Sequence, residues 1–289
     1  MIYMESYEFY KEAGKIAAEA LRKGLSYIKE GRTYLEVAEY MEGYILQRAE
    51  LAFPANISVN NVAAHYTPSM NDNLSFKKGD VVKLDVGAHV NGYIGDTAAT
   101  IEVGTQKYTR LIESATKALE EAIKVVRAGT KIEEIGRVIE DKIRSYGFVP
   151  VKNLQGHSLK QYNLHAGLSI PNYYRKMGRR LKEGEVIAIE PFSTDGAGMV
   201  VDAGIGNIYR ITRNSVMVKE IKNRFHGLPF AERWLYDIYG EKTSIRISFL
   251  MKRNLIAPYF KLVDMKGGTV AQREHTLYVK EDGCEILTL

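Results

Sequence analysis

A β-hairpin signal over residues 83–100, KLDVGAHVNGYIGDTAAT, constrains the fold more than any other feature of the sequence. Asn91-Gly92 stands between two arms of alternating residue types, and this dipeptide favours a two-residue type I′ turn that joins antiparallel strands. With that turn, Asp85 and Asp96 lie on the same face of the hairpin, as diagonal neighbours about 7 Å apart at the backbone. Because strand interiors usually avoid aspartate, the pair requires an explanation.

Two explanations for the aspartate pair are compatible with the hairpin. In the first, Asp85 and Asp96 lie on the solvated face of a half-buried hairpin whose other face is apolar. In the second they bind a cation, because two like charges on one face repel and an ion between them would turn that repulsion into a binding site. The small residues Gly87, Gly95 and Ala98 leave space above the aspartates for such an ion.

Bulk properties exclude several classes of protein. The 289 residues are 45% hydrophobic, which is enough for one large domain or two modest ones and argues against global disorder. No apolar run approaches the roughly 20 residues that span a bilayer, and the N-terminal stretch resembles neither a signal nor a transit peptide. With Cys284 as the only cysteine no internal disulfide can form, so we expect a reducing, cytoplasmic location. The 40 basic and 35 acidic residues give only weak support for contact with ribosomes or nucleic acid.

Residue spacing predicts a chain of mixed helices and strands. Apolar residues at intervals of three and four predict a helix over 4–30, and Thr33 and Thr130 are placed to cap the helices that follow them. For Thr130, Glu133 at the third helical position completes a capping-box pattern. The block 221–256 also has helical character and interrupts a β-rich half, so we interpret it as an insertion. Further segments are predicted as strands at about 80–90 and 93–103 and as helices at about 107–127 and 130–146.

Three residues elsewhere extend the cation hypothesis: His157 in QGHSL, Glu190 in IAIEPF and Glu274 in AQREHTL. Each alone has an ordinary explanation, as a hydrogen-bonded loop histidine, an edge-strand acid and a surface ion pair with Arg273. Together with the two aspartates they supply four carboxylates and one imidazole, a set that suits a hydrolytic centre with two metal ions better than structural zinc. The chain lacks the HExxH, GxSxG and P-loop motifs of the familiar alternatives.

In their order and local sequence, these five residues resemble the metal ligands of the methionine aminopeptidases of peptidase family M24. Two features are similar to the type 2 subclass of archaea and eukaryotes. One is the insertion before Glu274, and the other is the motif GHSLKQYNLH, in which His165 follows His157. A charged N-terminal extension of the eukaryotic kind is absent, so the resemblance is archaeal-like. The matching text extends over nearly the whole chain and includes NNVAAHYTP, LDVGAHVNGYIGDTA, GHSLKQYNLHAG, IEPFSTDGAG and AQREHTL.

The resemblance implies an α+β pita-bread (creatinase/aminopeptidase) fold with a helical insertion subdomain. The catalytic domain would comprise residues 1–206 and 260–289, and the insertion residues 207–259. The implied activity is removal of the initiator methionine from new proteins when the second residue is small, by water activated through two divalent ions, whether cobalt, manganese, iron(II) or zinc. The expected partners are peptides with N-terminal methionine and nascent chains, with transient ribosome contact and no membrane, and the expected state is a cytoplasmic monomer.

The resemblance also assigns roles to the metal ligands. Asp85 would chelate one ion, whereas Asp96 and Glu274 would bridge both ions. His157 and Glu190 would complete the coordination of the other ion. Glu190 would in addition carry the proton during catalysis, and the free α-amino group of the substrate would bind a metal, which restricts cleavage to the N-terminus.

A second group of residues matches the substrate-binding positions of the family. His65 and His165 correspond to the two histidines that would hydrogen-bond the scissile peptide and its developing oxyanion. Phe53, Phe192 and Tyr259 align with the pocket for the methionine side chain, although aromatic side chains are also ordinary core residues. The predicted catalytic residues are therefore the two histidines together with the proton-carrying glutamate.

Two other interpretations stay open at this point. Another pita-bread hydrolase, such as a proline-directed peptidase, usually carries an extra N-terminal domain, and the 64 residues before His65 are too few for one. A non-catalytic relative that binds ribosomes or nucleic acid would have lost metal ligands, and all five are present here. Cleavage of peptides with N-terminal methionine, as opposed to X-Pro dipeptides, distinguishes these interpretations.

Overall fold

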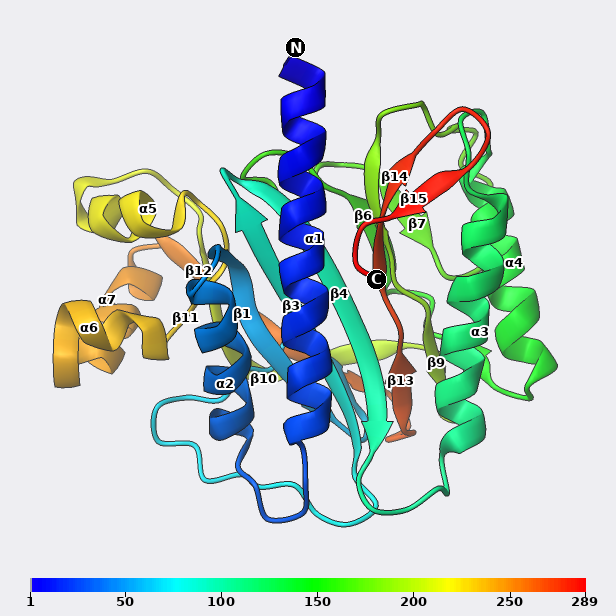
Figure 1. Ribbon diagram of the computed structural model, residues 1–289. Helices are drawn as coiled ribbons and strands as arrows, with labels where there is room; N and C mark the ends of the chain where they lie inside the picture. The colour runs from blue at the N-terminus through cyan, green and yellow to red at the C-terminus, as the bar shows by residue number, and fades with distance from the viewer. Residues whose placement is uncertain (1) are drawn as a thin grey trace.

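Helices and antiparallel strands alternate along the chain and pack in layers (Figure 1). The computed structural model describes residues 2–289, and within these residues the strands form sheets of three, four, three and five strands. Helices cover the outer side of the sheets, so the α+β class predicted from the sequence is confirmed.

A three-stranded sheet covered by two helices forms the N-terminal part of the fold. Its elements are α1 (Ile2–Tyr27), α2 (Tyr34–Leu46), β1 (Glu50–Val59), β3 (Val81–Val90) and β4 (Tyr93–Glu102). The strands lie in the order β1-β3-β4, and α1 packs across β3 and β4 while α2 packs on β1. The side chains of Val82, Leu84, Val86 and Ala88 are fully buried in the core shared with the helices, whereas Val90, predicted for the same face, is only partly buried.

A second helix pair covers the C-terminal sheets. The elements are α3 (Thr109–Val125), α4 (Ile132–Ser145), β5 (Val149–Pro150), β6 (Gln155–Ser158), β7 (Ser169–Pro171), β8 (Val186–Ile189), β9 (Phe192–Thr194), β13 (Val270–Gln272), β14 (His275–Val279) and β15 (Cys284–Ile286). The strands form two sheets, in the orders β13-β9-β5 and β15-β14-β8-β6-β7. Helix α3 packs against β9 and β13, and α4 packs against β5 and β7, so both sheets have one covered face.

Short helices, called the interrupting helices below, lie in the chain between two long strands that pair with each other. The elements here are β2 (Val62–Ala64), β10 (Val200–Ile211), α5 (Lys219–Phe225), β11 (Phe230–Ala231), the 3-10 turn η2 (Arg233–Leu235), α6 (Tyr236–Tyr239), α7 (Thr243–Lys252) and β12 (Ile256–Asp264). The sheet order is β11-β10-β12-β2, and Ile221, Leu235, Ile247 and Leu250 belong to a separate apolar core. The domain boundaries expected at 206/207 and 259/260 fall inside β10 and β12 and remain a prediction.

The hairpin over residues 83–100 forms with the expected turn and register. Asn91 and Gly92 have φ values of 51° and 85°, the left-handed conformation that a type I′ turn requires. Asp85 pairs with Ala98, and Asp96 pairs with Gly87. The two aspartates therefore share one face, but that face is covered by other segments of the chain, so the solvated-hairpin explanation is wrong.

The two predicted helix caps have different outcomes. Thr33 caps α2 in a complete capping box, as the sequence predicts. The prediction for Thr130 is wrong, because Lys131 occupies the N-cap position of α4 and its side chain makes no capping hydrogen bond. The Thr130 hydroxyl instead donates to the backbone oxygen of Val125 at 2.7 Å, which stabilises the loop between the two helices.

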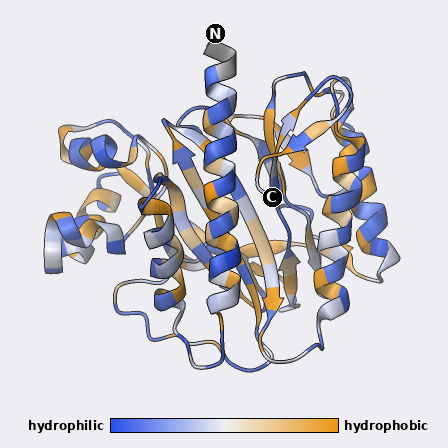
Figure 2. Ribbon diagram, viewed as in Figure 1, coloured by the Kyte–Doolittle hydropathy of each residue, from blue (hydrophilic) through white to orange (hydrophobic). Residues whose placement is uncertain are grey.

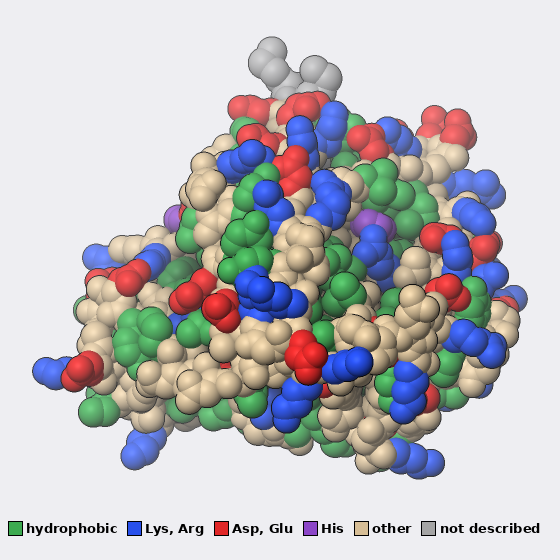
Figure 3. Space-filling model, turned by 60° about the horizontal axis from the view of Figure 1, so that its bottom comes forward, with side chains coloured by type: hydrophobic (Ala, Val, Ile, Leu, Met, Phe, Trp, Pro, Cys, Tyr) green, Lys and Arg blue, Asp and Glu red, His purple; other side chains and the backbone are tan. Residues whose placement is uncertain are grey.

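The outer surface of the fold carries mixed charge. Figure 2 shows hydrophilic residues on the outward sides of the long helices and apolar residues along the strands behind them. Figure 3 shows lysine and arginine side chains interspersed with acidic ones over one face, without a single large basic patch. Among the residues that the structure describes, none of the helices is both long and apolar enough to cross a membrane.

Candidate metal centre

A seam of hydrogen bonds brings the N-terminal hairpin against the segment that begins β14. The Glu274 N–H donates to the Ala98 carbonyl at 2.9 Å, and the Thr97 hydroxyl donates to the Glu274 carbonyl at 2.9 Å. Beside them, the Asp96 N–H donates to Thr276 Oγ1 at 2.9 Å. Asp96 and Glu274 therefore meet although they lie far apart in the sequence.

Strand pairing in the five-stranded sheet supplies the next two predicted ligands. His157 on β6 pairs with Ala188 on β8, and Glu190 directly follows the end of β8. His157 is 7% exposed, and its Nε2 lies 3.6 Å from Asp96 Oδ2. The ends of β6 and β8 thus carry a histidine and a glutamate to the aspartates of the hairpin.

One cavity contains every site residue predicted from the sequence. Asp96, His157 and Glu274 each offer a ligand atom, and these atoms all lie within 4.8 Å of one another. The cavity has a volume of about 290 Å³. Its lining includes the predicted metal ligands Asp85, Asp96, His157, Glu190 and Glu274, the histidines His65 and His165, and the aromatic residues Phe53, Phe192 and Tyr259.

Several ligand atoms in the cavity are buried without a hydrogen-bond partner among the described residues. They are Asp85 Oδ1, Asp96 Oδ1, His157 Nδ1 and Glu274 Oε1. An unsatisfied buried polar atom costs about 1–3 kcal/mol, so four in one cavity would be costly unless something occupies the space between them. Hard carboxylate oxygens with one imidazole fit divalent cations, so these residues could hold metal ions.

The pKa values of the carboxylic acids also indicate that the cavity suits divalent cations. Burial raises the pKa of Asp85 to about 7. Burial raises the pKa of Asp96 well above its ordinary value, and the charges of Asp85 and Glu190 add to the rise. The pKa values of Glu190 and Glu274 are raised well above their ordinary range by burial and then by neighbouring acids. Divalent cations would offset this repulsion and stabilise the ionised carboxylates.

The histidines of the cavity are neutral at pH 7. Burial, with a smaller contribution from the neighbouring His165, lowers the pKa of His157 to about 3 and that of His65 to about 4. Burial also lowers the pKa of His165. The 3.6 Å contact between His157 and Asp96 is therefore no ion pair, and a neutral imidazole retains a lone pair for a metal or for a hydrogen bond.

Two further histidines line the cavity beside the ligand cluster. The ring of His165 packs edge-on against the ring of His157, with centroids 4.5 Å apart. His65 directly follows β2 and packs edge-on against Tyr259, with centroids 5.3 Å apart. Its backbone has a φ of 66°, a left-handed conformation that is uncommon for histidine. Both imidazoles line the same cavity as the acids and can contact a molecule bound there.

Aromatic side chains form the apolar part of the cavity wall. Phe192 on β9 is 1% exposed and Phe53 on β1 is 5% exposed. Phe53 packs over Gly87 of β3 so closely that a β-carbon on Gly87 would lie 2.2 Å from the phenyl ring. The glycine between the two aspartates therefore makes room for an aromatic wall beside the acids.

Two polar residues of the site were missed at the sequence level. Gln272 Nε2 donates to Glu190 Oε2 at 3.3 Å and to Glu274 Oε2 at 3.4 Å, so it holds both glutamates. Asn56 on β1 pairs with Asp85 across the sheet, and its buried Oδ1 has no partner among the described residues. For Gln272 a signal existed, because it stands two residues before Glu274 in AQREHTL, and alternate residues of an extended segment share a face.

Sequence comparison relates almost the whole chain to one group of proteins. The family described as Metallopeptidase family M24 matches residues 8–281. A protein of Archaeoglobus fulgidus named methionine aminopeptidase is 46% identical in an alignment of 286 positions that covers 96% of this chain and 96% of that protein. A protein of the same name from Methanocaldococcus jannaschii is 42% identical in an alignment of 294 positions that covers 99% of each chain.

Solved structures are similar over the same extent. The crystal structure of methionine aminopeptidase from Rickettsia prowazekii has a TM-score of 0.75 at 25% identity and covers 99% of this chain, which covers 98% of that one. A structure of a thermophilic Arx1 has a TM-score of 0.83 over 98% of this chain and 90% of its own. At 15% identity, the second likeness concerns the fold alone.

Proposed function

The chain belongs to metallopeptidase family M24 and has the pita-bread fold expected from its sequence, and we propose that it is a methionine aminopeptidase. It removes the N-terminal methionine from peptides and new proteins whose second residue is small. Two archaeal relatives of that name align with 96% and 99% of its length, which supports the assignment.

The proposal depends on one observation, the cavity in which an acid-histidine cluster adjoins an aromatic wall. Asp96, His157 and Glu274 place ligand atoms within 4.8 Å of one another. Phe53 and Phe192 line the same space, which has a volume of about 290 Å³. A substrate with an apolar side chain next to its reacting peptide bond matches this combination of surfaces.

The ligand set fits two divalent ions. Asp85 would hold one ion, and Asp96 and Glu274 would hold both. His157 and Glu190 would complete the binding of the second ion. When bound, the ions would lower the pKa of a water molecule and polarise the peptide carbonyl. Cobalt, manganese, iron(II) and zinc all accept such ligands, so availability decides between them.

Other groups of the chain move protons and orient the peptide. The Glu190 carboxyl, hydrogen-bonded by Gln272, carries a proton from the attacking water to the leaving amine nitrogen. His65 and His165 are neutral, so each can donate one hydrogen bond to the scissile peptide without adding charge. Phe53, Phe192 and Tyr259 hold the methionine side chain through apolar contact.

The proposal extends to substrates and cellular setting. New proteins carry the methionine that this site accepts, so the activity belongs in the cytoplasm, with transient contact between enzyme and ribosome. A monomer is sufficient, because residues of a single chain line the cavity.

A peptide-cleavage assay tests the proposal. The protein is loaded in turn with each of the four metals and incubated with Met-Ala-X and Met-Lys-X peptides. We expect release of methionine from the first peptide and not from the second. Chelation should remove the activity, and readdition of metal should restore it. Cleavage of X-Pro dipeptides with methionine peptides untouched would instead indicate a proline-directed enzyme.

A further inference from the structure

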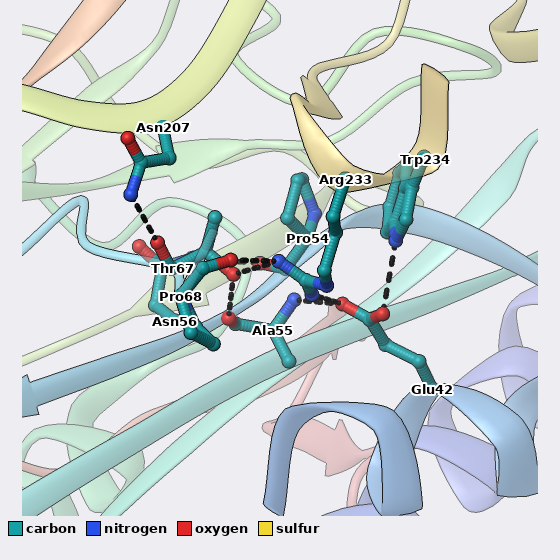
Figure 4. Close-up of polar contacts among 9 residues, drawn as sticks. All are labelled: Glu42, Pro54, Ala55, Asn56, Thr67, Pro68, Asn207, Arg233 and Trp234. Carbon is teal, nitrogen blue, oxygen red and sulfur yellow. Dashed lines mark hydrogen bonds and ion pairs between the residues drawn. The ribbon is translucent and has the colours of Figure 1, made fainter. Parts of the chain in front are cut away.

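A buried ion pair joins the interrupting helices to α2 (Figure 4). The Arg233 guanidinium contacts the Glu42 carboxylate, and the exposed fractions of the two residues are 5% and 4%. Glu42 Oε2 also accepts the indole N–H of Trp234 at 2.9 Å. Its Oε1 accepts the Ala55 N–H at 3.0 Å, so both carboxylate oxygens are used.

The same guanidinium contacts the segment that follows His65. Arg233 Nη1 donates to Thr67 Oγ1 at 2.7 Å and to the Pro68 carbonyl at 2.9 Å. Thr67 is fully buried, and its hydroxyl donates in turn to the Ala55 carbonyl at 2.7 Å. Arg233 therefore fixes a position two residues from a histidine of the cavity.

His65 needs such support because of its backbone conformation. A non-glycine residue at a φ of 66° is held there only when the surrounding structure imposes it. In the segment that follows His65, the Tyr66 carbonyl accepts the Ile57 N–H at 2.7 Å. The next residue, Thr67, donates its N–H to the Gly206 carbonyl at 3.0 Å. Figure 4 shows Arg233 between Glu42 and the Thr67-Pro68 segment, so the ion pair adds to this set of contacts.

Stability alone is a weak reason for burying these charges. A buried ion pair loses as much in desolvation as it gains in attraction, and well-packed apolar residues often serve stability equally well. What apolar side chains cannot supply is the directional fork by which Arg233 engages Glu42, Thr67 and the adjoining carbonyl at once. The geometry points to orientation of the His65 segment as the role of the pair.

We propose that Arg233 and Glu42 are positioning residues that hold His65 where it contacts the bound peptide. The inference rests on the proposed peptidase function only for its kinetic test. Through this pair, the packing of the interrupting helices on α2 sets the rate of the chemical step. Neither residue lines the catalytic cavity, so neither contacts the substrate.

The kinetic test uses Arg233→Met, with Arg224→Met as the matched control. Arg224 lies in the same insertion and pairs with Asp237 at 3.0 Å on the surface. We expect Arg233→Met to lower kcat about 10- to 100-fold with little change in KM, because a small displacement of a catalytic group costs this much. Arg233→Lys keeps the charge without the fork and should recover part of the loss, and the control should match the wild type.

A double-mutant cycle with His65→Ala distinguishes positioning from general destabilisation. If Arg233 acts through His65, Arg233→Met lowers kcat no further once the imidazole is removed. If the two losses multiply instead, Arg233 acts by another route and the inference is overturned. Bound cobalt, followed by its absorption spectrum, should be unchanged in Arg233→Met, because the metal ligands lie elsewhere.

A measurement without substrate keeps this inference separate from the proposed function. The histidine ring signals of the protein are recorded by ¹H–¹⁵N NMR and assigned with the His65→Ala variant. Arg233→Met should shift or broaden the His65 signals, and Arg224→Met should not. Unchanged His65 signals in a folded Arg233→Met protein would overturn the inference, whether or not the wild type cleaves methionine peptides.

Discussion

One hydroxyl, that of Thr276, satisfies both backbone groups of Asp96. Thr276 Oγ1 accepts the Asp96 N–H at 2.9 Å and donates to the Asp96 carbonyl at 2.8 Å. All of these groups are buried. The contact holds the edge strand β4 to β14, and it keeps Asp96 beside Glu274 in the metal centre.

Replacing Thr276 with valine should therefore weaken both folding and metal binding. Valine keeps the shape but leaves two buried backbone groups unpaired, at a cost of about 1–3 kcal/mol for each. Guanidinium unfolding of the metal-free protein, kept in a chelator, measures the loss of stability. Metal titration measures the loss of metal affinity. Thr116→Val removes only a hydrogen bond within α3, so it should leave metal affinity unchanged.

Glu274→Gln should abolish turnover. The amide cannot replace a carboxylate that we assign to both metal ions, so the added metal should no longer raise the melting temperature as it does in the wild type. Glu120→Gln, on the exposed side of α3, is the matched control. Turnover at the wild-type rate in Glu274→Gln would refute the assignment of two bridged ions.

The same substitution should stabilise the metal-free protein, and the gain should grow with pH. The pKa of Glu274 is raised by burial and by the acids Asp96, Glu190 and Asp85. The folded wild type therefore retains a proton that the unfolded chain releases above about pH 4.3. The stabilising contribution of this proton on Glu274 is complete below that pH and is lost as the pH rises toward the pKa of Glu274 in the folded protein.

Unfolding of the metal-free wild type and of metal-free Glu274→Gln between pH 4 and pH 9 measures this difference in stability. Glutamine does not titrate, so the two proteins should have similar stability near pH 4 and differ most at pH 9. The buried Lys83 and the histidines titrate in both proteins, so their contributions cancel in the difference. A difference in unfolding free energy between the two proteins that stays constant with pH would show that Glu274 is ionised in the metal-free protein.

Gly206→Ala should slow catalysis by displacing His65. A β-carbon at this position would lie 1.7 Å from the His65 carbonyl oxygen, so β10 and the His65 segment must separate. We expect kcat to fall at least about tenfold, as for other small displacements of catalytic groups. Gly43→Ala on α2 meets nothing within 4 Å and should instead stabilise the protein by about 0.5–1 kcal/mol.

The local parts of the fold could be predicted from the sequence because short-range chemistry decides them. The Asn91-Gly92 turn determines the hairpin register, and the register places Asp85 and Asp96 on one face. The cap at Thr33 is equally local. At Thr130 the same reasoning was wrong, because a hydrogen bond to Val125, the last residue of α3, competes with the cap.

What covers the aspartates could not be derived from the hairpin. The covering residues come from β6, from the end of β8 and from the segment before β14. Their residue types suggested a shared metal site with the hairpin, and the family resemblance assigned each a role. Gln272 and Asn56 escaped attention because an amide in a strand has many ordinary roles. The pair of Glu42 and Arg233, 191 residues apart, carries no local signal at all.

The seam between β4 and β14 also determines the order in which the enzyme becomes competent. Ribosomes make the chain from its N-terminus, so the hairpin with Asp85 and Asp96 is complete long before Glu274 is added. Until residues 272–276 have emerged, β4 is an open edge, and the acids along it have neither their neighbouring glutamate nor the Thr276 hydroxyl. A growing chain therefore cannot act on any substrate until its C-terminal segment has joined the hairpin.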